Sequence, residues 1–143
     1  MNALSRMHRC MKKDGVLLDV HPQPENSHIE IWQNGRIHLL GEIDQSEDHA
    51  EIEAARVHLD SFRNGGLFVE EQLGFFELLE HHPTVEHWQD NWADNGYRLL
   101  AEPSLLESAK QLLKSGGGEL VVREPVRATA LQRLDPNSNT HTP

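Results

Sequence analysis

The sequence predicts a mixed α/β fold, with residues 1–134 forming one domain and 135–143 a polar, disordered tail. Three observations support this class. A helical pattern near the N-terminus leads through a turn into a short apolar strand. An Asn-Gly pair lies between two alternating segments, and a long alternating segment follows the later helices. A chain of 143 residues is long enough to bury a single core.

The N-terminal segment combines a helix with an apolar strand. Three apolar residues share one helical face: Leu4, Met7 and Met11. Asp14-Gly15 ends the helix, and residues 16–20 follow as an apolar run of the kind that is covered on both faces in parallel sheets. The single cysteine excludes an internal disulfide, and its place in the helix predicts that Cys10 packs as a small hydrophobe.

A hairpin and a long helix come next. Asn34-Gly35 joins strands at 28–33 and 36–43, because both central residues of a type I′ turn need a positive φ. Asp44 or Ser46 can cap the following helix, which Gly65-Gly66 ends. Its apolar stripe consists of Ile52, Ala55, Leu59 and Phe62.

The pattern of residues 67–134 predicts two strands and two helices. Residues 67–79 are rich in aromatic and branched side chains and indicate a strand, and Thr84 caps a short helix that places Trp88 and Trp92 in the core. The sequence Ser104–Glu107 has the form of a capping box for a helix that runs to about residue 114.

The last strand is long and half-exposed. Gly116-Gly117-Gly118 ends the preceding helix. Residues 120–134 then alternate between two faces of a strand, with a kink expected at Glu124-Pro125. One face carries Leu120, Val122, Val126, Ala128 and Ala130, and the other carries Arg123, Arg127, Thr129 and Arg133.

Charge limits the classes of partner. The chain has 23 acidic and 13 basic residues, a formal net charge of −10, and no basic cluster longer than Lys12-Lys13. This balance disfavours nucleic acid and anionic membranes as partners. No apolar stretch approaches the roughly 20 residues of a membrane span, and the N-terminus lacks the apolar core of a signal peptide. We therefore expect a cytoplasmic protein.

Residues 9–20, Arg-Cys-Met-Lys-Lys-Asp-Gly followed by an apolar strand, resemble a segment of class I S-adenosylmethionine-dependent methyltransferases. In that family an "R-V-L-K-P-G-G" segment leads into the fifth strand, whereas Lys13 and Asp14 stand here in place of Pro-Gly. The resemblance implies a partial Rossmann-like sheet of strands five to seven, with flanking helices. Residues 67–79 would be strand six, and 119–134 an antiparallel strand seven between five and six. Residues 22–43 would be an inserted hairpin on the acceptor-substrate side.

The family's cofactor-binding elements have no counterpart in this sequence. They are a glycine-rich turn after strand one, an acidic residue after strand two, and residues after strand four. Gly116–Gly118 is no substitute, because it follows a helix and precedes a strand. The resemblance thus implies no cofactor bound by this chain alone, and S-adenosylmethionine only if a separate N-terminal half completes it.

Two groups of polar residues are candidate sites. Asp19 and His21 lie on alternate residues at the end of the first strand, where α/β folds place ligands, and they are substrate-side candidates. The alternative is a pair of polar residues without chemistry. The densest histidine group is His81, His82 and His87, but without a recognised ligand spacing it predicts a solvated turn and no metal site. No catalytic residue is identified.

Two functions therefore compete. In the first, the chain is the C-terminal part of a methyltransferase, inactive alone. In the second, it is a non-enzymatic binding or assembly module that pairs through an open sheet edge. The unpaired edge expected at residues 15–21 predicts either a homodimer or a complex with a separate cofactor-binding chain.

Overall fold

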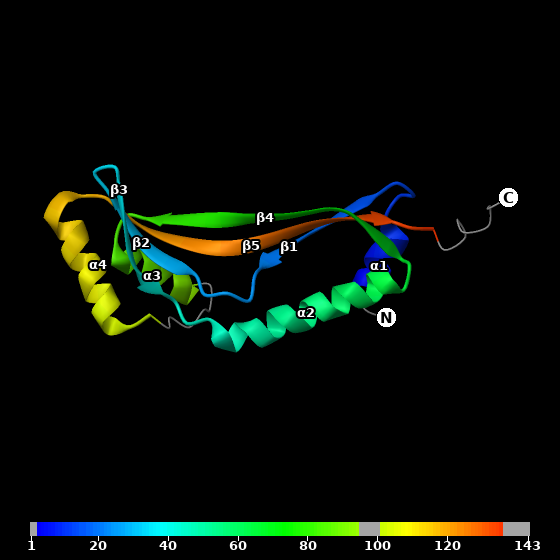
Figure 1. Cartoon of the computed structure of the whole chain (residues 1–143), viewed down its shortest axis with the longest axis horizontal. Helices are drawn as coiled ribbons and strands as arrows, with labels where there is room; N and C mark the ends of the chain where they lie inside the picture. Colours follow the sequence, from blue (N-terminus) through cyan, green and yellow to red (C-terminus); the bar gives the residue numbers. More distant parts are fainter. Residues whose placement is uncertain (1–2, 95–100, 136–143) are drawn as a thin grey trace. The chain divides into compact units, whose positions relative to one another are not determined.

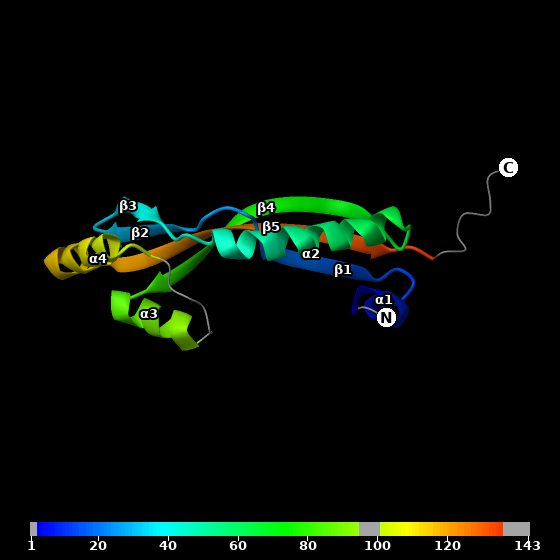
Figure 2. The same cartoon turned by 90° about the horizontal axis from the view of Figure 1, so that it is seen from below.

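The computed structural model of the chain describes residues 3–94 and 101–135, drawn in colour in Figures 1 and 2. In order, its elements are α1 (Ala3–Cys10), β1 (Val16–Pro22), β2 (His28–Gln33), β3 (Arg36–Glu42), α2 (Ser46–Asn64), β4 (Phe68–His82), α3 (Val85–Asp94), α4 (Pro103–Gly116) and β5 (Glu119–Arg133). The mixed α/β class is confirmed. The predicted tail falls outside the described residues except for Asp135.

The described residues divide into two compact units where the sequence suggested one domain. Unit 1 combines residues 3–23, 50–76 and 126–135, and unit 2 combines 24–49, 77–94 and 101–125. The strand β5 contributes its C-terminal half to unit 1 and its N-terminal half to unit 2.

The strands form an antiparallel sheet of five. Strand β5 pairs with β1 from Val126 to Gln132 and with β2 from Glu119 to Arg123, and it also pairs with β4. The hairpin β2–β3 is confirmed, with φ of 51° at Asn34 and 73° at Gly35. The resemblance implied a partial sheet of three strands with a separate hairpin. The strand count is therefore corrected, because β2 hydrogen-bonds to β5 and brings the hairpin into the sheet.

Within unit 1, β5 lies between β1 and β4. The backbone N–H of Arg133 donates to the carbonyl of Gly15, at 3.0 Å, and the N–H of Leu134 donates to the carbonyl of Leu67, at 2.9 Å. Successive N–H groups of an extended chain point to opposite edges, so the two bonds place one neighbour on each side of β5.

The unit 1 core joins α1, α2 and the three strands. Its buried members are Leu59, Phe68 and Leu131, with Leu4, Met11, Leu17, Phe62 and Leu67 packed around them. His8 is also buried, and its Nε2 lies 2.9 Å from the carbonyl oxygen of Leu134. The predicted helical face is therefore corrected, because His8 takes the inward position and leaves Met7 and Cys10 exposed.

Strand β1 is covered on one face only, so the prediction of a strand buried on both faces is wrong. Val16, Leu18 and Val20 are exposed, while Leu17 packs into the core. The strand pairs antiparallel with β5 and lies at an end of the strand order. An antiparallel strand can be covered by helices on a single side, whereas the apolar run alone indicated two.

Unit 2 packs two helices against β2, β3 and the first half of β5. Figure 1 shows α4 beside β2 and β3. The buried core consists of Ile29, Ile31, Ile43, Val85, Trp88, Ala109, Leu120 and Val122. Trp88 is fully buried, as predicted, and Trp92 packs edge-on against it with ring centroids 5.7 Å apart. The approach of α4 is close, since a Cβ added at Gly41 would lie 2.6 Å from Leu105 Cδ1.

The helix ends agree with the sequence at three places and differ at one. Asp44 Oδ1 accepts from the N–H of Ser46, Thr84 Oγ1 accepts from the N–H of His87, and Gly117 ends α4 with a φ of 66°. The predicted capping box is wrong, because α4 begins earlier with Pro103, whose fixed φ suits the first turn. No helix in the described residues is both long and apolar enough to cross a membrane.

Candidate functional site

The structure brings Asp19 and His21 into direct contact on the inner face of β1. His21 Nδ1 lies 2.9 Å from Asp19 Oδ2, and both side chains are less than a third exposed. Across the pair of strands, Asp19 faces Thr129 and His21 faces Arg127 in register. Arg127 Nε donates to Thr129 Oγ1 at 3.2 Å. We call Asp19, His21, Arg127 and Thr129 the polar quartet.

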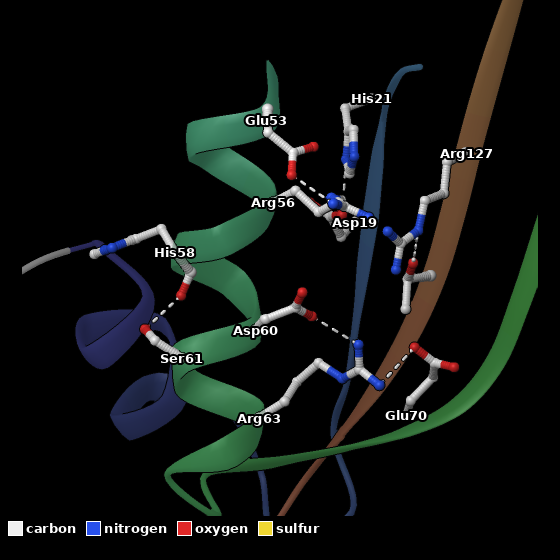
Figure 3. Close-up of polar contacts among 11 residues, drawn as sticks. Asp19, His21, Glu53, Arg56, His58, Asp60, Ser61, Arg63, Glu70 and Arg127 are labelled. Carbon is white, nitrogen blue, oxygen red and sulfur yellow. Dashed lines mark hydrogen bonds and ion pairs between the residues drawn. The ribbon is translucent and has the colours of Figure 1, made fainter. Parts of the chain in front are cut away.

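The helix α2 adds further charged side chains on the same side of the sheet. Figure 3 shows Arg56, Asp60 and Arg63 extending from α2 on the side of β1 and β5. Arg56 pairs with Glu53 along the helix at 2.5 Å. Arg63 pairs with Asp60 at 2.8 Å and with Glu70 of β4 at 3.0 Å, so it ties the helix to the sheet.

The polar quartet could handle a proton. When the Nδ1–H of a histidine donates to a carboxylate, its Nε2 is the nitrogen that can accept a proton from a substrate. Asp19 Oδ2, at 2.9 Å from His21 Nδ1, is close enough to orient the imidazole ring in this way. Sequence reasoning found this pair through its alternate spacing. It missed Thr129, which is fully buried, because the polar face of β5 was expected to be solvated.

A second polar cluster, in unit 2, was not predicted. Arg123 Nε donates to Glu30 Oε1 at 2.8 Å, and Arg123 also donates to Glu77. Trp32 Nε1 donates to Glu30 at 2.6 Å. The hydrogen bond from Arg123 is the main cause that lowers the pKa of Glu30, against the opposing effect of burial. The signal in the sequence was an acid in one alternating strand and a base in another, but only the register shows that they meet.

This cluster borders a shallow cavity of about 200 Å³. It is lined by Glu25, Asn26, His28, Glu42, Glu77, Arg123 and Pro125. His28 Nε2 lies 3.5 Å from Glu42 Oε1. Four of these residues belong to the region 22–43 that the resemblance assigned to the acceptor side, and the other three come from β4 and β5.

The histidine group is not the solvated turn that the sequence predicted. His82 is 2% exposed, and its Nδ1 lies 3.1 Å from His87 Nδ1. Burial is the largest cause that lowers the pKa of His82. His81 is exposed and contacts Glu119 at 3.2 Å instead. The strand extends to His82, so alternation turns one histidine inward and its neighbour outward. Within residues 3–94 and 101–135, no group of three or more His, Cys, Asp or Glu side chains could hold a metal ion.

The triple glycine Gly116–Gly118 does not form a cofactor-binding turn. The triple glycine follows α4 and leads into β5, and Gln33 Nε2 donates to the carbonyls of Leu112 and Gly117 there. The carbonyls at the end of α4 therefore bind the hairpin side chain Gln33. A nucleotide-like cofactor is held instead by a turn that follows a strand and begins a helix.

No protein-family model, no curated protein and no solved structure gives a significant match to this chain.

Proposed function

We propose that this chain is the acceptor-side, C-terminal part of a class I S-adenosylmethionine-dependent methyltransferase, with cofactor binding supplied by another part. The observation that carries the proposal is the position of β5. It lies between β1 and β4 in unit 1 and runs antiparallel to β1. The resemblance of residues 9–20 implies the same arrangement for strands five, seven and six of that family.

The proposal assigns this chain the acceptor and not the cofactor. Bound S-adenosylmethionine would supply an electrophilic methyl group. Because the proposal leaves cofactor binding to another part, we derive no step through the cofactor. Asp19 and His21 are the candidates for accepting a proton from the acceptor group, since they contact each other on the inner face of β1.

Titration calorimetry with S-adenosylmethionine tests the proposal. The chain alone should show no saturable binding. A complex with a cofactor-binding segment encoded next to it, containing a strand followed by a Gly-x-Gly turn, should bind the cofactor and transfer methyl groups. Saturable micromolar binding by the chain alone, or failure of every adjacent segment to form a complex, contradicts the proposal.

Matched variants of the complex then test the acceptor side. His21→Gln should lower methyl transfer about a hundredfold or more, the range of general base catalysis, while cofactor affinity stays unchanged. His81→Gln on β4, an exposed position outside both candidate sites, is the control and should leave both unchanged. Equal activity of the two variants removes His21 from the acceptor site.

A second candidate function is a binding or assembly module without enzymatic activity. The observation that favours it is the exposed apolar strand β1, with Val16, Leu18 and Val20 all more than half in solvent. A stable complex with an adjacent segment that never binds S-adenosylmethionine would favour this function over the first.

A further inference from the structure

The sheet of unit 1 has an apolar face that the helices leave uncovered. Phe68 is buried against Leu59 of α2, so the alternate residues of β4 from position 69 point to the opposite side. On β1, Leu17 packs toward α2, and its neighbours point away. The large exposed side chains on this side are Val16 (53%), Leu18 (63%), Val20 (51%), Val69 (41%), Leu73 (41%) and Phe75 (62%). We call them, with Ala128 and Ala130 of β5, the outer face.

The outer face carries almost no charge. The outward positions of β5 paired with β1 hold Val126, Ala128, Ala130 and Gln132. Among all the outward positions of the three strands described in unit 1, Glu71 is the one charged residue. The net charge of −10 therefore lies elsewhere on the chain, and two outer faces can approach with little direct repulsion.

The exposed apolar area of the outer face is large enough for an interface between two proteins. Six large side chains, each about half exposed, leave on the order of 500 Å² of apolar surface in water, which is as large as the largest patch on a typical monomer. Two such faces brought together bury on the order of 1,000 Å², the lower bound of a specific interface between two proteins. A second copy of the chain therefore supplies enough area.

The shape of the face selects how two copies meet. Leu18 pairs in register with Ala130, and Val20 with Ala128, so a low strip over β5 runs beside a ridge of larger side chains on β1. The exposed residues of β4 form a second ridge on the other side. Two aligned sheets can interdigitate when the β1 ridge of one copy lies over the low strip of the other. A two-fold axis makes this contact reciprocal.

We infer that the outer face of unit 1 is a homodimer interface, in which β1 of each copy packs over Ala128 and Ala130 of its partner. The inference does not depend on the proposed methyltransferase function, because it concerns no substrate or cofactor. A monomer would contradict the interface and leave the cofactor test untouched.

Sedimentation velocity of the full chain at micromolar concentration tests the interface. We expect a dimer for the wild type. Leu18→Lys places a charge at the most exposed position of the face, and Leu73→Lys does the same on β4. Each substitution occurs twice in a two-fold dimer. If each copy weakens the affinity of the dimer tenfold, the dissociation constant rises about a hundredfold.

Val57→Lys is the matched control. Val57 is 59% exposed on α2 of the same unit, away from the outer face, so this substitution should leave the dimer intact. Circular dichroism melts of all three variants check that each still folds. Because Leu18→Lys and Leu73→Lys lie on separate strands, one of them still tests the interface if the other does not fold. A wild-type monomer overturns the inference. A dimer that survives both Leu18→Lys and Leu73→Lys also overturns it and indicates pairing through strand edges instead.

Discussion

The two units differ in the sheet face that their helices leave uncovered. In unit 2 that face carries ion pairs, in which Arg123 binds Glu30 and Glu77, and His81 contacts Glu119. In unit 1 it carries aliphatic and aromatic side chains, from Leu18 on β1 to Phe75 on β4. Charged side chains on neighbouring strands neutralise one another on the unit 2 face, whereas the exposed apolar side chains of the unit 1 face are left in contact with water.

The largest expected effect lies in the unit 2 core. Trp88→Ala should lower the free energy of unfolding by about 3–5 kcal/mol, because the side chain is fully buried between helices and sheet. Phe75→Ala removes an aromatic ring from the outer face of unit 1, where the residue is 62% exposed, and should cost within about 0.5 kcal/mol in the monomer. Urea unfolding at high dilution measures both. Equal costs would contradict the difference between the units.

The ion pairs of unit 2 give the next largest effect. Arg123→Ala leaves the carboxylate of Glu30, which is 6% exposed, without its charged donor, and should cost about 2 kcal/mol. Glu77→Gln changes the exposed partner of the same arginine and should cost less than about 1 kcal/mol. Urea titrations of the two variants distinguish the cases. A small cost for Arg123→Ala would mean that the ion pairs do not stabilise this face.

Glycines in the two units provide a smaller and cleaner contrast. Gly35 in the hairpin has a φ of 73° with open space around it, so Gly35→Ala should cost about 1 kcal/mol through backbone strain alone. Gly74 on β4 has no positive φ and equally open space. Gly74→Ala should be neutral or slightly stabilising, and hydrogen exchange over each strand measures the difference. Similar losses at both sites would contradict the hairpin assignment.

The smallest expected effect is a pH dependence of unit 2. Burial lowers the pKa of His82 below the usual value of 6.5, so the unfolded chain binds the proton more readily than the folded one. The stability contribution of neutral His82 is present above pH 6.5 and is lost as pH falls toward the folded pKa. Thermal melts between neutral and mildly acidic pH should show a smaller loss in His82→Gln than in the wild type. Parallel losses would mean that His82 does not contribute.

Local patterns predicted most of the secondary structure. Asn34-Gly35, Thr84 and Gly116–Gly118 mark their turn, cap and helix end because each depends on the φ or side-chain oxygen of a few adjacent residues. The alternate spacing of Asp19 and His21 likewise placed both on one side of β1. Such features are decided within a few residues, so the sequence by itself determined them.

Contacts between distant segments were decided only by the tertiary structure. The register of β5 against β1 brings Thr129 and Arg127 to the polar quartet, and its register against β2 brings Arg123 to Glu30. The inward position of His8 depends on the carbonyl of Leu134, 126 residues away. An apolar run such as Val16–Val20 shows that a strand forms, but which of its faces is covered depends on where the helices pack.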